Sequence, residues 1–179
     1  MSDGFKILAF LCLIYALNWR PIDSVIFKLT NAVCSSYNKS WISINYCRLK
    51  AVSRNKAVFN LNITFLQPTN DIVLHYRLFK RENGYKPWLV NLKMNGCRFM
   101  RRPYDALGIV LFNTYKNFSN INHTCPYYGH VFIKDMYLST DIVRLPLFTG
   151  DYLLAIDWIF YGRLQFGTNV SYQFVEDLI

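Results

Sequence analysis

The segment NINHTCPYYG (residues 120–129) contains the residues of this chain that are best suited to chemistry. His123 lies two positions before Cys125, and histidine and cysteine are both zinc ligands. Cys125 could also act as a nucleophile if a neighbouring base held it as a thiolate. Asn122 begins an Asn-X-Thr triplet, which is an acceptor for an N-linked glycan. The segment therefore predicts a metal site, a cysteine nucleophile, or a glycosylated loop that ends in a disulfide.

The cellular compartment decides among these three interpretations. The apolar run ILAFLCLIYAL (residues 7–17) follows Lys6 and is too short to span a bilayer, as is typical of the central part of a signal peptide. A buried strand or helix is the alternative. We predict a signal peptide over residues 1–18, with an approximate cleavage site, and one secreted, extracellular domain over residues 19–179. A chain of this length has room for one core.

Two further patterns agree with secretion. Asn-X-Ser/Thr triplets are more frequent than the sixteen asparagines are expected to give by chance, and none contains proline. The predicted glycosylation sites are Asn38, Asn62, Asn117, Asn122 and Asn169. Four cysteines remain once Cys12 leaves with the signal peptide, an even number in an oxidising compartment.

The four cysteines predict two disulfides with three conceivable connectivities. We favour Cys34 with Cys47 and Cys97 with Cys125, because each pair closes a short loop. Cys125 is then neither a ligand nor a nucleophile. The three histidines, His75, His123 and His130, supply too few further ligands for zinc. We expect no metal and no cofactor.

Alternating apolar and polar residues dominate the chain from about residue 25, which predicts a mostly β fold. The predicted strands cover residues 25–34, 42–52, 57–65, 71–80, 86–94, 130–138, 151–161 and 163–174. Eight short strands predict an antiparallel two-sheet sandwich. Residues 152–161 are apolar on both faces except at Asp157, which is typical of a central strand. Residues 103–118 have helical spacing instead, although Gly108 weakens that pattern.

Alternation also assigns faces. Phe59, Leu61, Ile63 and Phe65 share one face of their strand, and Asn62 lies on the other. In residues 163–174, the apolar set is Leu164, Phe166, Val170, Tyr172 and Phe174, and the polar set includes Gln165 and Asn169. Both sequon asparagines, Asn62 and Asn169, are therefore expected to face outward.

The composition allows two kinds of interior. Aromatic residues make up 17% of the chain and hydrophobic residues 53%. This bulk either fills a solid core or lines an apolar cavity between splayed sheets, where a lipid-like ligand would gain from apolar burial. The predicted cavity wall consists of Phe59, Phe65, Tyr76, Trp88, Phe112, Phe132, Trp158 and Phe166.

Charge and motifs argue against nucleic acid and catalysis. The net charge is +9, but the basic residues are spread along the chain and are densest at residues 48–56 and 98–102. A solvated basic face is the usual meaning, and attraction to anionic headgroups or to a fatty-acid carboxylate is the functional alternative. Asp151 and Asp157 would lie about 20 Å apart on a strand, too far for a glycosidase carboxylate pair. We therefore expect no enzyme; Asp157 pairs with a nearby base or lies at an exposed bend.

Three ordered motifs carry a family resemblance: NGYKPWLVNLKMNGCRFM (residues 83–100), FSNINHTCPYYGHVFIKD (118–135) and LPLFTGDYLLAIDW (145–158). They resemble a large insect family of small secreted proteins that carries a domain-of-unknown-function label. That family is similar to the chemosensory CheB-like proteins and, remotely, to the ML lipid-recognition superfamily. The resemblance implies an immunoglobulin-like sandwich with a lipid cavity between its sheets. It also supports pairing of Cys97 with Cys125 and makes the mid-chain helix a lid over the cavity mouth.

The chain departs from these relatives at two positions. They often carry an acidic residue where this chain has Asn95, and a sequon where residues 91–93 have none. Together the patterns predict a secreted, non-enzymatic binder of a small hydrophobic ligand, lipid or pheromone-like, with a membrane receptor or a lipid surface as a further partner. The alternative is a structural or receptor-associated extracellular protein with a filled core that acts through its surface.

Overall fold

The computed structural model describes residues 25–139, 141–143 and 145–176. The predicted signal peptide lies outside these residues. Eight antiparallel strands form two sheets, which confirms the predicted all-β sandwich. The strands are β1 (Ile26–Ser36), β2 (Ile42–Ser53), β3 (Lys56–Thr69), β4 (Ile72–Glu82), β5 (Gly84–Asn95), β6 (Tyr127–Met136), β7 (Gly150–Phe160) and β8 (Arg163–Val175).

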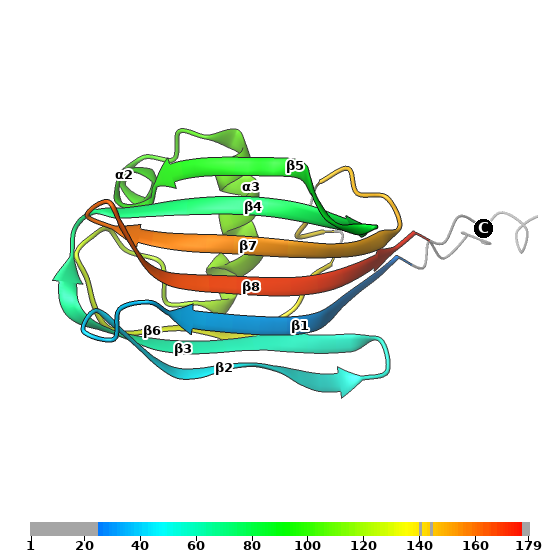
Figure 1. The fold of residues 1–179 in the computed structure, drawn as a ribbon, viewed down its shortest axis with the longest axis horizontal. Helices are drawn as coiled ribbons and strands as arrows, with labels where there is room; N and C mark the ends of the chain where they lie inside the picture. Colours follow the sequence, from blue (N-terminus) through cyan, green and yellow to red (C-terminus); the bar gives the residue numbers. More distant parts are fainter. Residues whose placement is uncertain (1–24, 140, 144, 177–179) are drawn as a thin grey trace, which may run out of the picture.

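The larger sheet, sheet A, has the strand order β1-β8-β7-β4-β5, and the smaller one, sheet B, has the order β2-β3-β6. β7 lies in the middle of sheet A, as its apolar sequence predicted. Strand β1 lies beside sheet B, so the two sheets meet along that side (Figure 1). The opposite side, between β5 and β6, is covered by the helical mid-chain segment.

The predicted faces of β3 are correct. Phe59, Leu61, Ile63 and Phe65 are all buried, and Asn62 lies on the outer face, where its Oδ1 accepts a hydrogen bond from Asn45 Nδ2 at 3.0 Å. In β8 the prediction holds from Phe166 onward, and Asn169 is exposed.

The start of β8 corrects the sequence prediction. Leu164 is 42% exposed, while Gln165 is only 3% exposed. The β7–β8 register shifts at this point, because Trp158 pairs with Phe166 but Ile159 pairs with Leu164. The extra residue in β8 is a bulge, and a shift of one residue exchanges the inner and outer faces of a strand.

Three short helical elements lie between β5 and β6: α2 (Gly96–Arg101), α3 (Ala106–Tyr115) and the 3₁₀ turn η1 (Lys116–Phe118). The predicted mid-chain helix is confirmed as α3 with η1, and α2 was not predicted. Asp105 caps α3, since its Oδ1 accepts from the Gly108 backbone N–H at 2.7 Å. A Cβ at Gly108 would lie 2.8 Å from Met94 Sδ, so glycine lets α3 pack closely on β5.

Asn95 caps α2 and contacts Asp71. Its Oδ1 accepts from the Arg98 backbone N–H at 2.8 Å and caps α2, while its Nδ2 donates to Asp71 Oδ1 at 3.1 Å. An aspartate at this position would still cap the helix, but its carboxylate would face that of Asp71. The amide suits this neighbour.

Candidate ligand cavity

The segment with His123 and Cys125 is a disulfide-anchored loop. Cys125 is bonded to Cys97, and the His123 ring stacks on Tyr127 with its Nδ1 2.7 Å from the Thr124 carbonyl oxygen. Asn122 is exposed. Across the residues that the structure describes, no three His, Cys, Asp or Glu side chains gather as a metal site. Cys125 is therefore unavailable as a thiolate, and the segment ends in a disulfide as the third interpretation predicts, while glycosylation of Asn122 stays a prediction.

Both favoured disulfides are confirmed, Cys34–Cys47 and Cys97–Cys125. Cys34 lies on β1 and Cys47 on β2, so the first bond ties sheet A to sheet B where they adjoin. Disulfides persist in oxidising compartments. Of the helices in the described residues, none is long and apolar enough to cross a membrane.

The sequon asparagines differ in their surroundings. Asn117, Asn122 and Asn169 are exposed, whereas Asn38 and Asn62 are half-buried. Asn38 Oδ1 accepts from the backbone N–H of Ser40 at 3.1 Å and from its hydroxyl at 2.7 Å. Three of the five predicted glycosylation sites thus have exposed asparagines.

An apolar cavity of about 80 Å³ lies between the two sheets. Four parts of the fold build its wall: the inner faces of both sheets, α3 and the β6–β7 connection. Representative wall residues are Tyr76, Trp158 and Val170 from sheet A, Phe59, Leu61 and Ile133 from sheet B, Leu111 and Tyr115 from α3, and Leu138, Val143 and Leu145 from the connection. In Figure 1, α3 crosses behind sheet A, where it closes the side between β5 and β6.

A second void of about 30 Å³ lies next to the first, toward α2. Tyr115, Ile121 and Trp158 line both voids, so these three side chains separate them. Movement of one of them would join the voids into a longer cavity.

Two hydrogen-bonded pairs of side chains lie in the otherwise apolar wall of the larger cavity. The Tyr76 and Tyr115 hydroxyl oxygens lie 3.1 Å apart, and Trp158 Nε1 donates to Thr168 Oγ1 at 3.2 Å. Burial raises the pKa of Tyr76 well above its ordinary value and raises the pKa of Tyr115 to about 12. Burial likewise raises the pKa of Tyr172. The cavity therefore disfavours negative charge.

Four residues of the predicted wall line a void. Phe59, Tyr76 and Trp158 line the larger cavity, and Phe65 and Trp158 line the smaller one. Sequence alternation had placed Phe59 and Phe65 on one face of their strand. These positions are the part of the prediction that the structure brings together.

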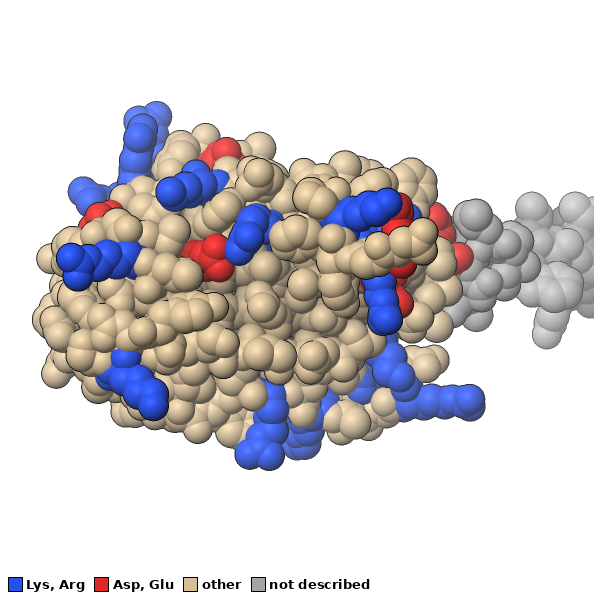
Figure 2. Space-filling model, viewed as in Figure 1, with Lys and Arg blue, Asp and Glu red and all other residues tan. Residues whose placement is uncertain are grey.

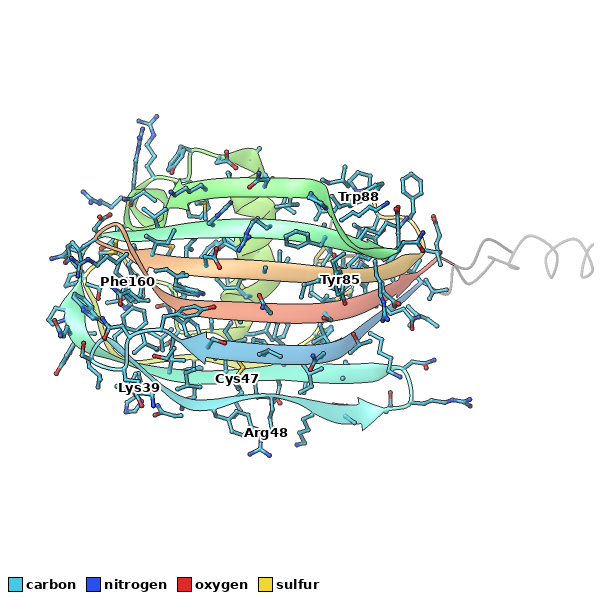
Figure 3. The ribbon with its side chains drawn as sticks, viewed as in Figure 1. Lys39, Cys47, Arg48, Tyr85, Trp88 and Phe160 are labelled. Atoms are coloured by element: carbon cyan, nitrogen blue, oxygen red, sulfur yellow. A yellow bond between two sulfur atoms is a disulfide. The ribbon has the colours of Figure 1, made fainter. Side chains whose placement is uncertain are left out.

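The other four residues correct the predicted wall. Phe132 is 40% exposed on the outer face of β6, opposite Asn62. Trp88 lies near the start of β5 (Figure 3), and its ring packs against Phe148. Phe112 packs on Phe99 and Tyr115, and Phe166 is fully buried against Trp158. Large aromatic residues of this chain thus lie outside the cavity wall, in the core or at the surface, as well as in it.

Sequence reasoning missed the aliphatic part of the wall. Val110, Leu111 and Thr114 come from α3, and Val143 and Leu145 come from the β6–β7 connection. Helical spacing in residues 103–118 was the signal for the first group. No periodic signal identifies wall residues in an irregular connection.

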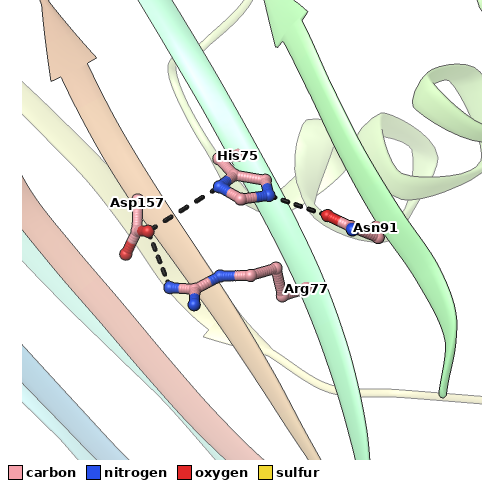
Figure 4. Close-up of polar contacts among 4 residues, drawn as sticks. All are labelled: His75, Arg77, Asn91 and Asp157. Carbon is pink, nitrogen blue, oxygen red and sulfur yellow. Dashed lines mark hydrogen bonds and ion pairs between the residues drawn. The ribbon is translucent and has the colours of Figure 1, made fainter. Parts of the chain in front are cut away.

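The outer face of sheet A carries a polar cluster (Figure 4). Arg77 Nη2 lies 2.7 Å from Asp157 Oδ2, His75 Nδ1 lies 3.9 Å from the same oxygen, and His75 Nε2 lies 2.8 Å from Asn91 Oδ1. Asp157 thus pairs with a base, one of its two predicted environments. On the face that Figure 2 shows, basic residues are scattered among large uncharged areas.

The model of one protein family matches residues 74–154: protein of unknown function (DUF1091). The match runs from β4 into β7 and includes α2, α3, Cys97 and Cys125. It supports the resemblance to a domain-of-unknown-function family. The similarity to CheB-like proteins and to the ML superfamily stays a prediction. No curated protein matches the chain.

Proposed function

We propose that this protein is a secreted, non-enzymatic binder of a small hydrophobic molecule, which it holds between its two sheets. The observation that carries the proposal is the apolar void between sheets A and B, whose wall is built by both sheets and α3. Wholly packed interiors rarely leave voids larger than a water molecule. Empty apolar cavities are known to take up apolar guests.

The volume of the cavity limits the size of a ligand that can enter without rearrangement of the wall. A cavity of about 150 Å³ binds benzene, and this one is smaller, at about 80 Å³. A longer guest must displace part of the wall. α3 and the β6–β7 connection are the parts of the wall outside the sheet hydrogen bonding, so they are the segments whose movement costs least. This assigns to α3 the role of a lid, as the family resemblance implies.

Secretion and lipid recognition complete the proposal. Two disulfides, an apolar N-terminal run and five sequons support an extracellular protein. The ligand would be a lipid or a pheromone-like compound, in keeping with the resemblance to CheB-like and ML proteins. Delivery to a membrane receptor or a lipid surface is the partner interaction that we propose.

A second candidate function follows from the small volume of the cavity. A protein whose core is nearly filled would bind no guest and would act through its surface as a structural or receptor-associated protein. Native mass spectrometry of protein purified from the medium of secreting cells separates the two. A hydrophobic compound that co-purifies supports the binder. Bare protein that also takes up no fluorescent fatty alcohol supports the second function and contradicts the first.

A further inference from the structure

The Tyr76–Tyr115 pair is the polar feature of the cavity that is best placed to select a ligand. Tyr76 comes from the inner face of β4, and Tyr115 is the last residue of α3. They are 1% and 9% exposed, both line the cavity, and their hydroxyl oxygens are 3.1 Å apart. The pair therefore bridges sheet A and the proposed lid inside an apolar space.

The Tyr76–Tyr115 pair has one more O–H donor than its mutual hydrogen bond uses. Each phenol has one O–H donor and an oxygen that accepts. The bond between the two oxygens uses one of the two hydrogens, and within the described part of the chain neither oxygen has another hydrogen-bond partner. One buried O–H donor is thus left over. A buried donor without an acceptor costs free energy that a suitable guest would recover.

The rest of the wall restricts the charge of that guest. No Lys, Arg, His, Asp or Glu stands among the described residues that line the cavity. A carboxylate placed there would lose its hydration without gaining a cation. Burial raises the pKa values of Tyr76 and Tyr115, which indicates that this environment also disfavours negative charge on their hydroxyls.

We propose that the cavity selects a neutral, mainly hydrocarbon molecule with one accepting oxygen, such as a ketone, an ester or an alcohol, and that the Tyr76–Tyr115 pair donates to that oxygen. This inference rests on the proposed function and names its ligand class. It excludes free fatty acids in their ionised form. The basic surface of the protein then plays no part in holding the ligand.

Three probes of equal carbon number test the ligand class: hexane, methyl butyl ketone and hexanoate. Each is titrated at neutral pH into the folded protein, and NMR follows the methyl resonances of Ile133 and Val170 in the cavity wall. We expect the ketone to bind roughly tenfold more tightly than hexane, the usual effect of one hydrogen bond made in a buried site. Hexanoate should leave both resonances unshifted.

Matched variants test the donor. Replacing both tyrosines (Tyr76→Phe with Tyr115→Phe) should abolish the preference for the ketone, while binding of hexane is retained. Tyr152→Phe is the control, because it removes a buried hydroxyl that bonds to Phe148 outside the cavity. If the double variant does not fold, Tyr76→Leu with Tyr115→Phe replaces it, because a single substitution would leave one O–H donor in the cavity. Thr168→Val and Tyr172→Phe test other hydroxyls of the wall.

Each outcome decides a different point. If no probe shifts the cavity methyls, the proposed function itself fails, and this inference fails with it. If all three bind equally, or if the ketone preference survives in the double tyrosine variant and is lost in Thr168→Val or Tyr172→Phe, binding stands and the inference is overturned. Arg144 stands in the sequence between the wall residues Val143 and Leu145 but lies outside the described residues. The Arg144→Gln variant is therefore also titrated with hexanoate. Hexanoate binding that this variant abolishes would also overturn the inference.

Discussion

Cys97 and Cys125 join the first turn of α2 to the segment before β6, so one covalent bond closes a loop that contains all of α3. Cys97 is 1% exposed and belongs to the hydrophobic core, which fixes one end of this loop in the protein interior. The same loop supplies Leu111 and Tyr115 to the cavity wall. The disulfide would therefore limit how far the proposed lid can move.

Removing this bond should destabilise the fold and loosen the lid. The loop spans a sequence separation of 28 residues, for which the chain-entropy model gives about 3.5 kcal/mol. We expect the variant with Cys97→Ala and Cys125→Ala to lose about that much free energy of unfolding in urea. Ligand should also exchange faster from this variant.

The other disulfide provides the control. Cys34–Cys47 has a separation of 13 residues and should contribute about 3 kcal/mol, but it lies where the sheets meet, away from α3. Its removal should lower stability without changing the rate of ligand exchange. Equal acceleration of exchange in both double variants would show that stability, not the lid, controls access.

Filling the cavity should block binding. Val170 lines the void from β8, so Val170→Phe places a ring in the space that a guest would take. We expect loss of uptake of a fluorescent fatty alcohol, with a cost to stability of about 1–3 kcal/mol from overpacking. The measurements are fluorescence titration and urea unfolding.

Val33→Phe is a matched control for that substitution. Val33 lies on the neighbouring strand β1, paired with Asn169, and is 48% exposed on the outer face. The same change there should leave uptake intact. If Val170→Phe binds the probe as well as wild type, the guest does not lie between the sheets.

The sandwich and its disulfides were predictable because both depend on short-range patterns. Alternation with period two identifies strands and their buried faces, and β3 follows this rule along its inner face from Phe59 to Phe65. An even number of closely spaced cysteines in an oxidising compartment favours local pairs, and both pairs are local.

The parts that were missed depend on tertiary contacts. Nothing in the local sequence marks Gln165 as the extra residue of a bulge, because the register of β8 is set by its pairing with β7. Helix α2 has only 6 residues and begins at an Asn95 cap that is held by Asp71 from the connection between β3 and β4. The cavity wall was predicted from aromatic residues alone, but side-chain size does not say whether a residue fills space or borders it.

The ion pair between Arg77 and Asp157 should have a small, salt-dependent effect. The two atoms lie 2.7 Å apart in the middle of sheet A, with the Arg77 and Asp157 side chains 38% and 22% exposed. Pairs this exposed contribute little, so Asp157→Asn should cost about 1 kcal/mol or less. This loss of stability should be smaller at about 1 M salt, because the Debye length is then only about 3 Å and the ion pair is screened.

Glu82→Gln is the control for this prediction, since Glu82 and Lys86 form a more exposed pair at 3.4 Å. Its effect on the free energy of unfolding should be close to zero. A cost for Asp157→Asn that does not respond to salt would mean that the carboxylate acts through hydrogen bonds with fixed geometry instead of through charge.

Alkaline pH should destabilise the protein through its buried tyrosines. The pKa of Tyr115 is raised by burial from 10.0 to about 12, and the pKa of Tyr76 is also raised. Between these values the unfolded chain loses the phenolic proton while the folded protein keeps it, so the unfolded state binds fewer protons and stability falls as pH rises. Below pH 10 the full stability is present, and above it each such tyrosine costs about 1.4 kcal/mol per pH unit.

The variant with Tyr76→Phe and Tyr115→Phe separates this effect from general alkaline denaturation. It lacks two of the three tyrosines that line the cavity among the described residues, and only Tyr172 remains, so its free energy of unfolding in urea should fall less steeply than that of wild type above about pH 10. Ultraviolet absorbance should also show fewer tyrosines that titrate only on unfolding. Parallel slopes for the two proteins would mean that these hydroxyls ionise in the folded state, which requires water to reach the cavity. That outcome would remove the dry environment on which selection of a neutral ligand depends.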